Sequence, residues 1–246
     1  MSKHLTLRSG NPALRSSIFK KQSVNASLGV MTVSGTVNKT GISLLLLILS
    51  AGYSWGNPAM HGMVLPALII GVVLAIATVI KPTIGHITVP MYAVVEGVVL
   101  GVISMLADAL YPGIAVQAIF LTFGTLGALL LAYKSGLIAA TENFKLGVVA
   151  ATGGIGILYL INFAMGFFGS GISIISSNNT MGILFSGFVV VIAALNLVLD
   201  FDFIEEGAEN GAPKYMEWYG AFGLLVTLIW LYLEILRLLM KLQSRR

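Results

Sequence analysis

Acidic side chains within apolar sequence are the residues of this chain best suited to chemistry. Asp200 ends a long apolar run, and Asn196 lies one helical turn before it on the same face. Glu96, Glu217 and Glu234 lie in two further apolar segments. A charged carboxylate near the middle of a bilayer costs on the order of 2.5–3.5 kcal/mol, so it tends to face other helices, take a partner or hold a proton.

The chemistry of these acids depends on whether they meet in space. Like charges a few ångströms apart resist joint ionisation, so two or three converging carboxylates would titrate as a unit. In the deprotonated form their oxygens make a hard-cation site suited to Ca²⁺, and in the protonated form they favour a compact, closed bundle. The residue types therefore predict a proton-sensitive cation pathway, on the condition that the carboxylates converge.

Asp200, Asp202 and Glu96 each have a structural alternative. Asp200 and Asp202 can simply mark the end of a helix, and at about 200° apart around a helix they cannot both point inward. Asp202 fits a solvated face or loop better, as do the acids that follow it at positions 205, 206 and 209. Glu96 has no cation one turn away, so it is either functional or a buried polar contact with another helix.

Glu234 and Glu217 also have plain structural interpretations. Arg237 follows Glu234 by three residues, so the two can form a self-contained pair with Arg237 reaching toward the membrane interface. Glu217 begins its helix, where the helix dipole alone would stabilise a negative charge.

Catalytic and metal-binding alternatives have little support in the sequence. The absence of cysteine excludes thiolate metal sites, thiol nucleophiles and disulfides. The histidines are not spaced as ligands, and the serines of the apolar segments have no histidine–carboxylate set beside them. We expect no enzyme activity and no cofactor other than Ca²⁺ as a permeant ion.

The elements that carry these acids are predicted to be membrane-spanning helices. Each apolar segment is roughly as long as a helix needs to be to cross a ~30 Å hydrocarbon core. Only 10% of the residues are charged, against roughly 25% in an average soluble domain. The sequence predicts an all-α membrane protein, with a disordered basic N-terminal tail over 1–39, a seven-helix transmembrane domain over 40–240 and a short basic tail over 241–246. The seven apolar segments lie near residues 40–56, 63–80, 89–110, 113–133, 146–168, 181–199 and 218–240.

The positions of the cations predict an orientation. With a cytoplasmic N-terminus, the loops that would face outward, near 57–62, 111–112 and 169–180, contain no Lys or Arg. The cytoplasmic side would carry Lys81, Lys134, Lys145 and Lys214. The cations of the C-terminal tail are the exception, because seven crossings would place them outside. Either this tail violates the positive-inside rule, by which Lys and Arg gather on the cytoplasmic side, or one segment is re-entrant. The net charge of +4 belongs to tails and loops, so we expect no nucleic-acid partner.

The combined pattern resembles the Bax-inhibitor-1 (transmembrane Bax-inhibitor-motif) family, in a bacterial branch. Seven short-looped helices match it, as do an acidic exit from the sixth segment and a characteristic closing helix. The sequences that carry the resemblance are LDFDFI at 199–204, YMEWY at 215–219 and LYLEILRLL at 231–239.

The resemblance implies a bundle with the last helix near its centre and a pair of acids on the last two helices that senses pH for a Ca²⁺ leak. Asp200 matches the first acid, and Glu217 or Glu234 matches the second, so Asp200 and Glu217 are the candidate transient Ca²⁺ ligands. The family's early arginine, which latches onto the acid of the sixth helix, has no counterpart, since the second and third segments contain no Arg.

Two functions follow from this resemblance as expectations. The first is a pH-sensitive Ca²⁺ leak channel or transporter in a bacterial inner membrane, working between lipid, Ca²⁺ and H⁺. The alternative is an interaction protein that modulates a membrane-bound protease or a stress response, with the N-terminal tail as its handle.

Overall fold

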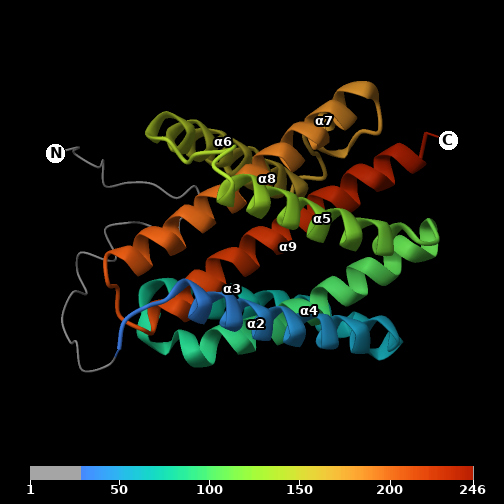
Figure 1. The fold of residues 1–246 in the computed structure, drawn as a ribbon. Coiled ribbons are helices and arrows are strands. Elements are labelled where there is room, and N and C mark those ends of the chain that lie inside the picture. Colours follow the sequence, from blue (N-terminus) through green and yellow to red (C-terminus); the bar gives the residue numbers. More distant parts are fainter. Residues whose placement is uncertain (1–28, 246) are drawn as a thin grey trace. The chain divides into compact units, whose positions relative to one another are not determined.

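Seven long helices form the described part of the chain, residues 29–245 of the computed structural model (Figure 1). Each is long and apolar enough to cross a membrane, which confirms the predicted all-α, seven-helix membrane protein. The predicted tail residues 1–28 lie outside the described residues. The long helices are α2 (Val33–Trp55), α3 (Val64–Ile80), α4 (Gly85–Leu110), α5 (Ile114–Lys134), α6 (Glu142–Gly166), α8 (Thr180–Glu209) and α9 (Met216–Gln243), and the short ones are η2 (Pro58–Met63), η3 (Pro82–Ile84) and α7 (Ser173–Ser176).

The first helix begins at Val33, so the tail boundary predicted at residue 40 is too late. Thr32 caps the helix by accepting a hydrogen bond from the backbone N–H of Gly35. The polar side chains after it do not break the helix, because the hydroxyls of Thr36 and Thr40 donate to carbonyls one turn earlier. Lys39 is consequently a helical residue rather than part of a tail. At the other end, α9 continues to Gln243, beyond the boundary predicted at residue 240.

The described residues form two compact units, and α8 and α9 each contribute to both. Unit 1 contains residues 111–201 and 227–245, and unit 2 contains residues 29–110 and 202–226. The last helix is the most buried of the seven spans, with 67% of its apolar window buried. Burial in protein suits this helix because it carries the acids Glu217 and Glu234, which lipid would leave without partners.

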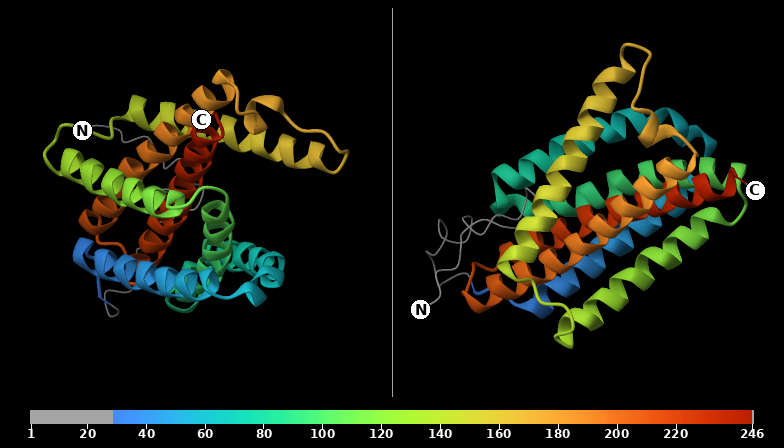
Figure 2. Two further views of the ribbon diagram at one scale, coloured as in Figure 1. Left: turned by 90° about the vertical axis from the view of Figure 1, so that its right-hand side faces the viewer. Right: turned by 90° about the horizontal axis from the view of Figure 1, so that it is seen from above.

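Close packing of α4 on α2 organises unit 2 (Figures 1 and 2). Gly97 and Gly101 lie on one face of α4, four residues apart. A Cβ at Gly97 would lie 2.5 Å from the carbonyl oxygen of Leu47, and one at Gly101 would collide with the backbone at Ala51. The glycines therefore allow the two helices to approach closely, which is the packing role expected for them in lipid.

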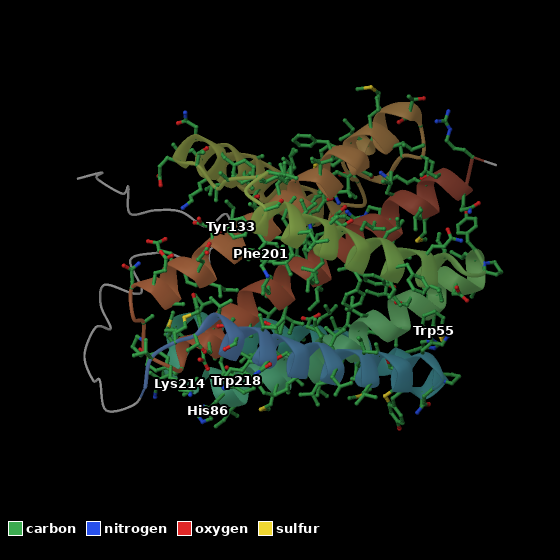
Figure 3. The ribbon with its side chains drawn as sticks, in the orientation of Figure 1. Trp55, His86, Tyr133, Phe201, Lys214 and Trp218 are labelled. Atoms are coloured by element: carbon green, nitrogen blue, oxygen red, sulfur yellow. The ribbon has the colours of Figure 1, made fainter. Side chains whose placement is uncertain are left out.

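Unit 1 packs α6 against α8. Ile155 of α6 and the α8 residues Val189 and Ile192 form a buried cluster, against which Trp230 of α9 packs. The rings of Tyr133 on α5 and Phe201 on α8 lie 5.9 Å apart (Figure 3).

Candidate functional site

Asp200 is the most deeply buried acid of unit 1. Its side chain is fully buried in α8, and neither carboxyl oxygen has a hydrogen-bond partner of ordinary geometry within residues 29–245. The hydroxyl of Thr227 on α9 is the polar group that faces it. Asn196, one turn earlier, donates from Nδ2 to Oγ1 of Thr152 on α6 at 2.8 Å. A polar strip therefore leads along α8 to a carboxyl group that forms no ion pair with any residue from 29 to 245.

Glu217 is the most deeply buried acid of unit 2, and both of its carboxylate oxygens are occupied. Oε1 accepts from the backbone N–H of Thr32 at 3.0 Å and from the Thr32 hydroxyl at 2.9 Å. Oε2 forms an ion pair with Nζ of Lys39 on α2. The ammonium of Lys39 also lies 5.6 Å from the centroid of the Trp218 ring, a distance compatible with a cation–π contact. The first turn of α9 is thus bound to the first two turns of α2.

The backbone around Glu217 joins the same two segments. The N–H of Met31 donates to the carbonyl of Ala212 at 2.7 Å, and the N–H of Lys214 donates to the carbonyl of Gly29 at 3.1 Å. Figure 3 shows Lys214 and Trp218 at the end of unit 2 where α2 begins. This short antiparallel bridge ties the chain before α2 to the α8–α9 connection.

Glu234 forms the predicted pair with Arg237, at 2.9 Å, but the pair is not self-contained. The hydroxyl of Tyr159 on α6 donates to Oε1 of Glu234 at 2.9 Å and accepts from Nη1 of Arg237 at 2.6 Å. The Arg237 side chain is 40% exposed, whereas that of Glu234 is 2% exposed. The three side chains join α6 to α9 within unit 1.

Glu96 and Asp202 are less enclosed, and both belong to unit 2. Both are partly exposed. The carboxylate of Glu96 lies against α3, where a Cβ at Gly71 would be 2.6 Å from Oε1. Glu96 therefore contacts a neighbouring helix, as its structural interpretation requires.

Each predicted acid thus has surroundings of its own. Within residues 29–245, no three side chains of His, Cys, Asp or Glu gather closely enough to hold a metal ion. The role of these acids in sensing pH or binding Ca²⁺ stays a prediction. What the sequence analysis missed is Lys39, which it assigned to a tail. A sequence signal for it is Thr32, a residue type common at helix N-caps, but a threonine alone does not fix a helix start.

Comparison with protein families identifies the chain at this point. The family model described as Bax inhibitor 1 like matches residues 11–244, almost the whole chain. The chain belongs to the Bax inhibitor 1-like family. Comparisons with curated proteins and with solved structures returned no match. The family match spans every long helix of the structure, including the starts of α2 and α9 that Lys39 and Glu217 join.

Proposed function

We propose that this Bax inhibitor 1-like protein is a pH-regulated Ca²⁺ leak in a bacterial inner membrane, with its N-terminus in the cytoplasm. The observation that carries the proposal is Asp200, a fully buried acid on a membrane-spanning helix whose oxygens have no ordinary hydrogen-bond partner within residues 29–245. Intramembrane acids are retained at a cost, which favours a functional role for one that has no compensating cation within the described part of the chain.

The two protonation states of Asp200 offer different interactions. The protonated acid is neutral and can donate one hydrogen bond, whereas the hydroxyl of Thr227, which faces it, can donate to the ionised form. The carboxylate is an acceptor only, and its oxygens are suitable ligands for a hard cation such as Ca²⁺. Exchange between the two states couples passage of Ca²⁺ to pH, with conduction favoured when Asp200 is ionised.

Flux into proteoliposomes tests this proposal directly. Purified protein would be reconstituted, and Ca²⁺ entry measured from about pH 5.5 to 8 for wild type and for Asp200→Asn. We expect a flux that rises with pH in wild type and that falls to the level of empty vesicles in Asp200→Asn, because an amide cannot ionise.

A matched control lies on the same helix. Asp202→Asn makes the same chemical change two residues later, at a partly exposed position, and we expect it to keep both the flux and its pH dependence. An Asp200→Asn protein with unchanged flux and unchanged pH dependence would remove Asp200 from the mechanism. A wild-type protein with no flux above empty vesicles at any pH would refute the leak itself.

A further inference from the structure

Both carboxylate oxygens of Glu217 are bonded, and its side-chain partners come from the start of α2. Its two oxygens accept three hydrogen bonds, two from Thr32 and one from Lys39. The Thr32 hydroxyl also accepts from Gly35 N–H at 3.0 Å, so one hydroxyl both caps α2 and binds α9. The start of α2 therefore depends on the charge of an acid on another helix.

The packing around this carboxylate is shaped to admit it. Gly35 faces Glu217, and a Cβ at that position would overlap the carboxylate. A Cβ at Gly220, one turn further along α9, would lie 3.0 Å from Cγ2 of Thr36. The two glycines let the first turns of α2 and α9 approach closely. The Glu217 side chain is 1% exposed, and that of Lys39 is 18% exposed.

We propose that Lys39 and Glu217 form a latch that holds the start of α2 on the start of α9, and that Lys39 is thereby a positioning residue of the Ca²⁺ leak. With the latch closed, α2 stays packed on α9 and conduction is low. Separation of the pair frees the start of α2, and the leak increases. The role of the latch in conduction rests on the proposed function, whereas the latch itself does not.

Removal of either charge opens this latch for a physical reason. Without Lys39, the Glu217 carboxylate would be buried with only the two Thr32 donors, and a buried charge that loses its ionic partner is strongly destabilised where it lies. As long as it stays ionised, the side chain can recover solvation only if the first turns of α2 move away from it. Lys39→Arg keeps the positive charge and the reach to Oε2, so it should keep the latch closed.

The absence of cysteine in the chain allows the latch to be observed without measuring flux. Thr36→Cys places a single thiol at a fully buried position between α2 and α9. In the full-length protein, the rate of maleimide labelling at this position should rise by about tenfold or more in Lys39→Met and in Glu217→Gln, because loss of a buried ionic partner far exceeds the ~1.4 kcal/mol that a factor of ten requires. It should stay at the background value in Lys39→Arg. A second reporter, Ser104→Cys in α4, is also buried and should remain protected throughout, which separates release of α2 from general unfolding.

Flux measurements with the same variants then connect the latch to the leak. Lys39→Met and Glu217→Gln should both raise Ca²⁺ flux above wild type, the double variant should equal either single one, and Lys39→Arg should behave as wild type. If position 36 stays protected in Lys39→Met, there is no latch, whatever the flux. If position 36 becomes labelled while flux stays at the wild-type value, α2 is latched but Lys39 does not control the leak. A wild type without any Ca²⁺ flux would instead refute the proposed function. The existence of the latch would then be decided by the labelling of position 36 alone.

Discussion

Replacement of Gly35 by alanine should destabilise the protein, although alanine is the better helix former. A Cβ at position 35 overlaps the Glu217 carboxylate, which is fixed there by Thr32 and Lys39. Because the carboxylate is the end of a flexible side chain, it can move away, but in moving it gives up its hydrogen bonds. The cost of Gly35→Ala is therefore the loss of these bonds rather than a rigid backbone clash.

The magnitude follows from the bonds at stake. Removing a glycine from a helix favours alanine by roughly 0.5–1 kcal/mol. A hydrogen bond to a charged group contributes roughly 1.5–3 kcal/mol, so losing two of the three bonds to Glu217 gives a net destabilisation of about 2–5 kcal/mol. Gly41 offers the matched control on the same helix, because a Cβ there meets no atom within 4 Å. Gly41→Ala should be neutral or slightly stabilising.

Thermal unfolding in detergent, followed by tryptophan fluorescence, would rank these variants. We expect Tm to fall in the order Gly41→Ala, wild type, Gly35→Ala. The decisive test is Gly35→Ala combined with Glu217→Ala, in which the overlap no longer exists. In that background the alanine should carry no penalty. A penalty of the same size with and without the carboxylate would refute the reasoning, because it would show that Gly35 is needed for something other than Glu217.

Two further predictions concern unit 1. Tyr159→Phe removes the hydroxyl shared by Glu234 and Arg237, so it should destabilise the protein by roughly 1–3 kcal/mol in the same unfolding assay. The control is Tyr53→Phe, which should have little effect, because the exposed Tyr53 hydroxyl has only a 3.4 Å contact with Nδ2 of Asn57. Lys241→Met removes the ammonium that donates at 2.8 Å to the carbonyl of Ile175 in the α6–α8 connection and at 3.0 Å to that of Gly182 in the first turn of α8, so limited proteolysis should cut the connection faster. An unchanged cleavage rate would show that Lys241 does not hold it.

The fold could be predicted from sequence because span length and low charge are properties of whole segments. The boundary of the first helix could not, because hydropathy counts Thr36, Thr40 and Lys39 as polar. In the structure these polar groups are satisfied within the protein. The two hydroxyls bond to backbone carbonyls one turn earlier, and the lysine pairs with Glu217. The same error hid the latch, since a lysine assigned to a tail is not considered as a partner for Glu217.

The contact between α2 and α9 also bears on the number of crossings. Thr32 and Lys39 lie at the start of α2, and Glu217 lies at the start of α9, so the two helices begin on the same side of the membrane. This requires an even number of crossings before α9, which the six preceding spans supply. A re-entrant segment among those six would place Glu217 on the opposite side from Lys39, so the structure argues against it. Lys241, a cation of the tail that the expected orientation would place outside, binds the carbonyls of Ile175 before α8 and of Gly182 in its first turn.

The partners of the acids bear on which of them could serve the proposed passage of Ca²⁺. Ca²⁺ at Glu217 must displace Lys39, and Ca²⁺ at Glu234 must displace Arg237, so either site would exchange one ionic interaction for another. Asp200 has neither an ion pair nor an ordinary hydrogen bond within the described chain, so a cation there would gain an interaction without breaking one. The resemblance implied a pair of sensing acids, with Asp200 as one member. In this chain both candidates for the second member have a basic partner, which favours Asp200 as the acid at which the proposed function would act.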